Sequence, residues 1–329
     1  MRSIVMRLAG CVLALLWAVG AAGAGDSIRL GVLKFGTVNW ELAALKHHGF
    51  DRQNGFDLDI VPLAGKDASA IAFLAGDVDA IVTDWLWVSR MRAEGRDYVF
   101  VPYSSSVGAM MVPSDSDVKT LADLKGKTIG VAGGPLDKSW LLLQGFAQQS
   151  SGLDLKAENT IVFGRPPLLA EKARQGELDA VLNFWHYAAR LEAVGFRRLA
   201  SAEDATRQLG ATGPVSSIGY VFSEAWAAEN PEMALGFVKA SRATKSLLKE
   251  SDAEWDRLQD EGVIRDDDTA LATLRTRFRE GIPARAVSDE EADAAKVYEV
   301  LAALGGEKLV GSAETMSPGT YWQRLKHDF

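Results

Sequence analysis

The chain has 329 residues, a length that predicts about two domains of ordinary size. Its 47% hydrophobic and 24% charged residues are typical of a globular protein with a sizeable core. The formal net charge of −8 and the pI near 5.2 exclude an ordinary nucleic-acid binder, because such a protein presents a basic face.

Residues 1–24 read as a signal peptide. Two arginines precede an apolar run from Leu8 to Gly20, and Ala22-Gly-Ala24 is a small-residue cleavage site. The run is too short to span a bilayer comfortably, and no later run reaches about 18 apolar residues. We expect secretion to the periplasm and a mature charge of −10 once both arginines leave. The single cysteine, Cys11, would leave too, which excludes disulfides and thiolate chemistry in the mature protein.

The next stretch alternates strands with helices. We expect strands at 27–33, 58–63 and 80–82, with helices capped by Asn39 and entered after Gly65, and a third opening at Trp85. This rhythm predicts right-handed crossovers and a parallel sheet. Strands at 98–103 and 109–112 follow, and the polar, Gly-containing segment 104–108 between them is a candidate hinge.

A second set of elements repeats the first. Gly176-Glu-Leu-Asp-Ala180 matches Gly76-Asp-Val-Asp-Ala80 at a spacing of 100 residues, and Ile129-Gly-Val-Ala132 echoes Leu30-Gly-Val-Leu33. Strands are expected at 129–132, 161–163 and 180–182, and a helix starts near Asp137. The repeat predicts two Rossmann-like α/β lobes with a hinge and an interlobe cleft.

The boundaries follow from these elements. Lobe 1 covers 25–105 and lobe 2 covers 106–215, with a return crossing near 210–219. Residues 216–329 return to lobe 1 through a strand at 219–222 and then form C-terminal helices, with breaks near Ser251, Gly262 and Gly281.

Both copies of the repeat, together with Thr120-Leu-Ala-Asp-Leu-Lys-Gly-Lys-Thr-Ile-Gly-Val131, carry a family resemblance. The chain resembles the periplasmic solute-binding proteins of nitrate/sulfonate/taurine-type ABC importers, a group that includes binders of thiamin-pyrimidine precursors. The resemblance implies the type II periplasmic binding protein fold, a small-molecule ligand between the lobes, and delivery to an ABC permease with its ATPase. It implies no cofactor and no catalysis. We further expect no nucleic-acid partner and no stable homo-oligomer.

In open α/β sheets, ligands bind beyond the carboxyl ends of the strands, near helix N-termini. The loops at these positions supply the candidate ligand-binding residues, which are Lys34, Phe35, Thr37, Asn39, Trp40, Lys66, Asp84, Trp85, Gly134, Lys138, Trp140, Arg165, Asn183, Trp185 and His186.

The loops are rich in aromatic residues. Trp85 and Trp185 occupy equivalent positions in the two lobes, so they are placed to approach one flat ligand from opposite sides. Any single ring is as readily explained by packing in a lobe interior, because tryptophan is a large core residue.

The polar signal is Gly133-Gly134 followed by Lys138. Two glycines allow close backbone approach, and the next helix offers N–H groups to an anion. The alternative is an ordinary turn with a solvated lysine. Arg165 is a possible fork for a carboxylate or simply an exposed side chain. Asp84 opposes a simple anion site, and it either meets an N–H group of the ligand or caps its own helix.

These features favour a planar aromatic anion, with pyrroloquinoline quinone as a candidate. An aliphatic sulfonate such as taurine, or a pyrimidine, is the alternative. An enzyme on the same fold is a competing hypothesis, because a pyrimidine-synthesising enzyme resembles these binding proteins. That enzyme depends on a cysteine-rich segment, which this sequence lacks, and no metal-ligand spacing is visible. The ligand-sensing half of a receptor is a third hypothesis.

Overall fold

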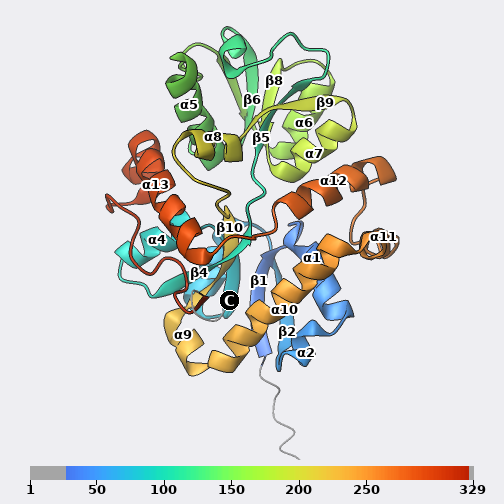
Figure 1. Cartoon of the computed structure of the whole chain (residues 1–329), viewed down its shortest axis with the longest axis vertical. Helices are drawn as coiled ribbons and strands as arrows, with labels where there is room; N and C mark the ends of the chain where they lie inside the picture. The colour runs from blue at the N-terminus through green and yellow to red at the C-terminus, as the bar shows by residue number, and fades with distance from the viewer. Residues whose placement is uncertain (1–26, 326–329) are drawn as a thin grey trace, which may run out of the picture.

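The strands form two separate five-stranded sheets, each the centre of one lobe (Figure 1). The structure is a computed structural model that describes residues 27–325, so the signal peptide predicted at 1–24 lies outside the described residues. The two-lobed α/β architecture predicted from the sequence is confirmed.

The sheet of lobe 1 has the strand order β2-β1-β3-β10-β4. Its strands are β1 (Ser27–Leu33), β2 (Asp57–Leu63), β3 (Ala80–Thr83), β4 (Tyr98–Ser104) and β10 (Ile218–Ser223). The sheet of lobe 2 has the order β7-β6-β8-β5-β9. Its strands are β5 (Ala109–Pro113), β6 (Thr128–Ala132), β7 (Thr160–Gly164), β8 (Ala180–Asn183) and β9 (Phe196–Ser201).

The parallel pairing predicted for the alternating strands and helices is confirmed, but each sheet as a whole is mixed. The β1–β3 and β6–β8 sets are parallel as expected, but β10 runs antiparallel to β3 and β4, and β5 runs antiparallel to β8 and β9. Strands β5 and β10 are the ones that enter from the other lobe, so they run against the strands of the βαβ units. Strand β9 was missed, because its two arginines interrupt the apolar run.

Helices cover both sheets (Figure 1). Their bounds are α1 (Val38–His47), α2 (Phe50–Gln53), α3 (Lys66–Ala75), α4 (Trp85–Ala93), α5 (Lys138–Ser151), α6 (Pro166–Arg174), α7 (Trp185–Ala193), α8 (Ala202–Gln208), α9 (Glu224–Glu229), α10 (Pro231–Glu250), α11 (Asp252–Asp260), α12 (Asp268–Glu280), α13 (Val287–Gly305) and α14 (Glu307–Val310), with a 3₁₀ turn at Leu121–Leu124. Within residues 27–325, none of these helices has the length and apolarity needed to cross a membrane.

The repeated Gly-x-x-Asp-Ala motif joins a helix to a strand in each lobe. Gly76 caps α3 with a φ of 78°, a conformation that favours glycine. Three residues on, Asp79 accepts a hydrogen bond from the backbone N–H of Arg29 at 2.8 Å. In lobe 2, Asp179 accepts one from the N–H of Thr128 at 2.8 Å. The motif therefore fixes the start of the neighbouring strand, and its recurrence is a structural requirement.

The chain crosses between the lobes at 105–108 and again at 209–217. The backbone N–H of Ser105, in the first crossing, donates to the carbonyl of Gly281 at 2.9 Å. A Cβ added to Gly281 would come within 1.9 Å of the Ser106 hydroxyl oxygen, so the close approach requires glycine here. The C-terminal region therefore braces the first crossing.

Two C-terminal helices contact lobe 2 as well as lobe 1. Helix α12 packs against α7, and α13 packs against α5, on either side of the waist of the molecule (Figure 1). The guanidinium of Arg190 on α7 donates to Asp266 at 2.5 and 2.9 Å. The region after 216 therefore does more than return to lobe 1.

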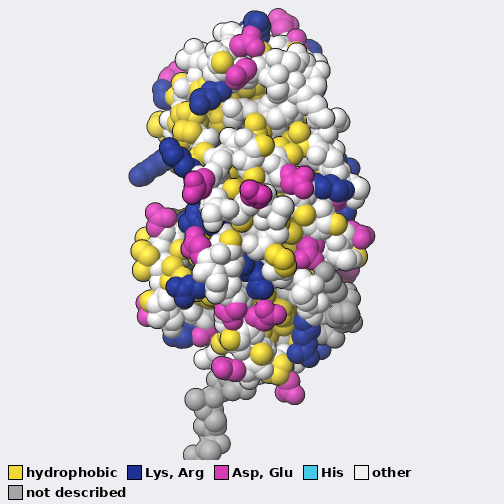
Figure 2. Space-filling view, turned by 90° about the vertical axis from the view of Figure 1, so that its left-hand side faces the viewer, with side chains coloured by type: hydrophobic (Ala, Val, Ile, Leu, Met, Phe, Trp, Pro, Cys, Tyr) yellow, Lys and Arg dark blue, Asp and Glu magenta, His cyan; other side chains and the backbone are white. Residues whose placement is uncertain are grey.

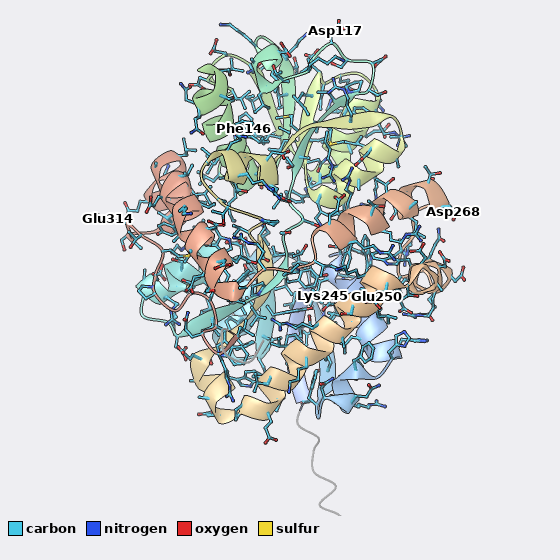
Figure 3. All side chains as sticks on the ribbon, in the orientation of Figure 1. Asp117, Phe146, Lys245, Glu250, Asp268 and Glu314 are labelled. Carbon is cyan, nitrogen blue, oxygen red and sulfur yellow. The ribbon has the colours of Figure 1, made fainter. Side chains whose placement is uncertain are left out.

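A buried carboxylate links the two chain segments of lobe 1. Glu41 on α1 is fully buried and accepts hydrogen bonds from Tyr220 on β10 at 2.9 Å and from Ser241 on α10 at 2.7 Å. It also pairs with Lys245, whose ammonium lies 4.1 Å from the ring centroid of Tyr103. Figure 3 labels Lys245 on α10. Burial lowers the pKa of Lys245, but Glu41 opposes this effect.

Removing the charge of Glu41 should strongly destabilise lobe 1. We expect Glu41→Gln to cost about 3–5 kcal/mol of unfolding free energy, because it leaves the Lys245 ammonium buried without a counter-charge. Urea denaturation measures the loss. The matched control is Glu41→Gln/Lys245→Met, which removes both charges and should recover part of it. A Glu41→Gln variant within 1 kcal/mol of the wild type would contradict this account.

Candidate functional site at the interlobe junction

Two helices begin at the surface where the lobes meet, one from each lobe. Helix α4 of lobe 1 begins at Trp85 after the cap residue Asp84, and α5 of lobe 2 begins at Lys138 after Asp137. The Lys138 ammonium lies 3.0 Å from a carboxylate oxygen of Asp84. The lobes are thus joined by an ion pair between residues that the sequence placed in the ligand site.

Asp84 takes one of the two roles left open by the sequence, that of capping its own helix. Its carboxylate accepts the backbone N–H of Trp87 at 2.9 Å, which caps α4, and it also faces Lys138. Burial on its own would raise the pKa of Asp84, but the positive charges of Lys138 and Lys66 outweigh it and lower that pKa. Burial likewise works to lower the pKa of Lys138, and Asp84 outweighs it and raises that pKa. Both groups are therefore charged at neutral pH.

The Gly133-Gly134 turn contains a carboxylate of its own. Both glycines have positive φ values, 87° and 91°, and a Cβ on Gly133 would lie 2.6 Å from the Asp137 carboxylate. Asp137 accepts the backbone N–H of Trp140 at 3.1 Å. Of the N–H groups at the start of α5, that of Trp140 is therefore already bound by the preceding side chain. Burial raises the pKa of Asp137.

Four aromatic rings form a cluster across the junction. Trp40 on α1 and Trp185 on α7 meet edge to face at a centroid distance of 5.9 Å. Trp255 on α11 lies 5.9 Å from Trp40, and Phe278 on α12 lies 6.4 Å from both Trp40 and Trp185. We call these four residues the interlobe aromatic cluster. The ring that Trp185 meets across the lobes is thus Trp40, whereas the sequence pattern paired it with Trp85.

The four predicted tryptophans are buried in this conformation. Trp40, Trp85, Trp140 and Trp185 expose 6%, 4%, 1% and 8% of their surface. Trp140, the most buried of the four, lies on α5 and packs in the core of the molecule. A ligand therefore reaches these rings only if the lobes separate.

The loop after β1 contains one correction and two exposed side chains. Helix α1 begins at Val38, so Asn39 is not its cap; its amide donates to the carbonyls of Leu33 at 3.0 Å and Gly36 at 2.8 Å and holds the loop. Thr37 takes the cap position without a side-chain hydrogen bond. The ring of Phe35 is 88% exposed, and the ammonium of Lys34 lies 5.6 Å from its centroid.

The remaining candidates lie on three other loops. Lys66 begins α3 and is exposed, and its charge acts on both Asp84 and Asp137. Arg165 precedes α6 and is exposed. Asn183 is fully buried. Its amide nitrogen donates to the carbonyl of Pro166 at 2.9 Å, and its amide oxygen accepts from the backbone N–H of Phe184 at 2.9 Å, so the side chain holds its own loop in shape.

His186 does not supply positive charge to the site. Burial lowers its pKa to about 3, and the nearby Arg190 charge adds to that effect, so the imidazole is neutral at pH 7. Its Nδ1 atom is buried and has no hydrogen-bond partner. Among residues 27–325, no group of three or more His, Cys, Asp or Glu side chains is placed to hold a metal ion.

Sequence reasoning missed the contribution of the C-terminal helices. Trp255 and Phe278 complete the interlobe aromatic cluster, and Arg277 on α12 pairs with Glu192 on α7. A cavity of about 30 Å³ at the first crossing is lined by Ser105, Ser106, Val107, Trp185, Arg198, Ser201, Glu203, Arg277, Glu280 and Gly281. This volume suits a water molecule rather than a solute, so the lobes meet closely here. Figure 2 shows the surface hollowed at one edge between the lobes, with basic and acidic side chains on both sides.

A family model described as "NMT1/THI5 like" matches residues 41–253, more than half of the chain. No curated protein matches the sequence. Among solved structures, the alkanesulfonate-binding protein SsuA of Xanthomonas axonopodis pv. citri bound to MOPS is similar with a TM-score of 0.65 and 19% identity, covering 90% of this chain and 98% of that one. The periplasmic aliphatic sulphonate binding protein SsuA of Escherichia coli has a TM-score of 0.69 and 18% identity, covering 92% and 99%. An ABC transporter structure from Parabacteroides distasonis has a TM-score of 0.67 and 11% identity, covering 90% and 98%. These TM-scores establish a shared fold.

The Asp84–Lys138 pair should contribute a measurable coupling between the lobes. We expect a double-mutant cycle with Asp84→Asn and Lys138→Gln, measured on the free energy of unfolding, to give a coupling energy of about 0.5–1 kcal/mol. The value is small because a third of the Lys138 side chain is exposed. Asparagine keeps an oxygen for the Trp87 N–H, so Asp84→Asn removes the charge and retains the cap. Additive single effects would contradict a coupled pair.

The same coupling should depend on pH with a defined sign. Since the pKa of Asp84 lies below its ordinary value of 3.8, the coupling should be present above 3.8 and disappear as the pH falls through the folded-state value. The raised pKa of Lys138 places the alkaline loss above 10.5. Urea denaturation of the four cycle members between pH 2.5 and 7 measures the acid limb. A coupling that disappears well above pH 3.8, or that grows as the pH falls, would exclude this ion pair as its source.

Proposed function

Because the chain belongs to the NMT1/THI5-like family and has two lobes joined by two crossings, we propose that it is the solute-binding component of an ABC importer. It captures a small molecule between the lobes and delivers it to a membrane permease and its ATPase. The predicted signal peptide and the likeness to the periplasmic aliphatic sulphonate binding protein of Escherichia coli support a periplasmic location. It binds without turnover and needs no cofactor.

The observation that carries this proposal is the Asp84–Lys138 pair at 3.0 Å. It lies between helix starts from opposite lobes, where α/β folds bind ligands. Lys138 is a charged group that an anionic solute can take over from Asp84. Exchanging one carboxylate for another anion keeps the lysine neutralised, so binding and closure are linked through the same ammonium.

The charges and rings of the junction support an anion with a flat apolar body. Lys138 and Lys66 supply positive charge, and Trp40 and Trp185 supply apolar surface from opposite lobes. Pyrroloquinoline quinone is a candidate in this class, and an aliphatic sulfonate or taurine is the alternative. The Asp84 carboxylate disfavours a bare inorganic anion, because the negative charge of Asp84 would repel it unless that carboxylate moves away or is compensated.

Two conservative variants test the exchange of anions on Lys138. Lys138→Gln should weaken binding about ten- to a hundredfold, because a hydrogen bond to a charged group contributes about 1.5–3 kcal/mol. Asp84→Asn should strengthen binding of an anion several-fold, because the competing carboxylate is gone. Titration calorimetry of both variants with pyrroloquinoline quinone, taurine and a longer alkanesulfonate provides the measurement.

The opposite response to Asp84→Asn identifies a different ligand. If that variant binds more weakly, the Asp84 carboxylate contacts an amine or ring N–H of the solute, and the anionic proposal fails. A solute whose affinity is unchanged by both variants does not bind at this junction. Lys172→Gln, on α6 of lobe 2, is the matched control for loss of one lysine charge away from the junction.

The interlobe aromatic cluster should report binding. We expect the solute to change tryptophan fluorescence, because it must separate Trp40 from Trp185 to enter between them. Trp185→Ala should weaken binding of an aromatic anion by about 1–3 kcal/mol, by analogy with base–ring stacking. The same variant should have a smaller effect on taurine, which has no ring to stack. Equal effects on the two ligands would assign Trp185 to packing alone.

A further inference from the structure

Helix α12 is anchored on lobe 1. The ring of its Phe278 lies 5.1 Å from that of Trp255 on α11, which is fully buried. The Trp255 indole N–H donates to the carbonyl of Leu248 on α10 at 2.8 Å, and the Arg279 guanidinium on α12 donates to the same carbonyl at 3.0 Å. Since α10 packs against α1 and α2, these contacts fix α12 to lobe 1.

The segments on either side of α12 are fixed as well. On α11, the Glu254 carboxylate lies 2.9 Å from Nε2 of His48, the residue that follows α1. Beyond α12, the Gly281 carbonyl accepts the Ser105 N–H in the first crossing at 2.9 Å. Helix α12 is therefore held at both ends, and it cannot follow a movement of lobe 2 without breaking these contacts.

Two ion pairs join this anchored segment to α7 of lobe 2. The Arg190 guanidinium on α7 donates to Asp266, just before α12, at 2.5 and 2.9 Å. In the other direction, Arg277 on α12 donates to Glu192 on α7 through Nε at 3.0 Å and also through Nη2. Each side thus supplies one cation and one carboxylate, and this alternation fixes how α12 lies on α7.

Both pairs have the geometry that makes an ion pair effective. Each is bidentate, and the four side chains expose only 14–33% of their surface. Bidentate, partly buried arginine–carboxylate pairs contribute more than single contacts between exposed side chains. Figure 1 shows α12 reaching from lobe 1 to α7 at the waist of the molecule. Because α7 belongs to lobe 2, both pairs must break when the lobes separate.

The same helix carries a ring of the interlobe aromatic cluster. Helix α7 begins at Trp185, which packs on Trp40 across the junction and lies 6.4 Å from Phe278. Arg190 and Glu192 lie between one and two turns further along α7. Their pairs with the C-terminal segment therefore hold the helix that presents Trp185, although neither side chain belongs to the cluster.

We propose that Asp266 and Arg277 are positioning residues that form an interlobe clamp on α7. The clamp sets how readily the lobes separate, and with it how readily Trp185 leaves Trp40. Its residues act through α7 and need no contact with a solute. This inference rests on the proposed function in one respect, namely that a solute must enter between the lobes.

A charge-neutral double variant tests the clamp. Asp266→Asn/Arg277→Gln removes one partner from each pair and keeps the net charge of the chain. The ratio of open to closed molecules should rise about three- to tenfold, or about 0.7–1.4 kcal/mol at about 1.4 kcal/mol per factor of ten. Double electron–electron resonance measures this ratio in the mature chain without added solute. Nitroxide labels are placed at Ala75→Cys in lobe 1 and Ala157→Cys in lobe 2, both exposed positions. The chain's only cysteine, Cys11, lies in the predicted signal peptide.

The matched control is Glu171→Gln/Arg207→Gln, which also preserves the net charge. It breaks the pairs Arg174–Glu171 and Arg207–Glu203, each within one helix of lobe 2, and should leave the ratio unchanged. Circular dichroism and thermal melts establish that every variant is folded.

A charge swap separates a clamp from a general loss of stability. Asp266→Arg places two cations together and should open the lobes, whereas Asp266→Arg/Arg190→Asp restores the pair in reverse and should close them again. The proposal is overturned if Asp266→Asn/Arg277→Gln leaves the ratio unchanged, if the control raises it equally, if the swap does not restore it, or if the wild type is mainly open. Since no solute is used, a failed titration bears on the proposed function alone, and an unchanged ratio bears on the clamp alone.

Discussion

Lobe 1 depends on one buried carboxylate, that of Glu41. The chain leaves this lobe after β4 and returns at β10, so its core is assembled from two segments separated by the whole of lobe 2. Glu41 belongs to the first segment, and its partners Tyr220, Ser241 and Lys245 belong to the second. A buried charge tolerates little displacement of its partners, because an unpaired charge in the core is very costly. The pair therefore fixes how the returning segment docks on the first.

This constraint also positions the interlobe junction. Glu41 is next to Trp40 in the first turns of α1, so the network that fixes α1 also fixes the ring that meets Trp185. Helix α10 carries Lys245 on its buried face, so the same pair also fixes α10 against α1. The core pair thus stands behind the proposed binding surface at the junction, to which α1 contributes Trp40.

The junction is nearly balanced in charge. Lys66 and Lys138 face Asp84 and Asp137, and each carboxylate also caps its own helix. Helix starts that would otherwise attract any anion are therefore already satisfied. In the proposed site, selectivity depends on whether a solute binds Lys138 more favourably than the Asp84 carboxylate that it displaces. Helices α12 and α13 contact both lobes, so opening also requires that their packing on α7 and α5 yields.

Local patterns in the sequence determined the elements and their repetition. The strands β1 and β2 and the helix start at Trp85 follow from apolar runs and turn residues, which act within a few residues along the chain. The two-lobed plan follows from the 100-residue repeat of these local patterns. Only the tertiary structure decided the antiparallel direction of β5 and β10, the pairing of Trp185 with Trp40, and the occupation of the Gly133 turn by Asp137. Each of these depends on which segments meet after the chain crosses between lobes, and a sequence pattern confined to one segment carries no information about its distant partner.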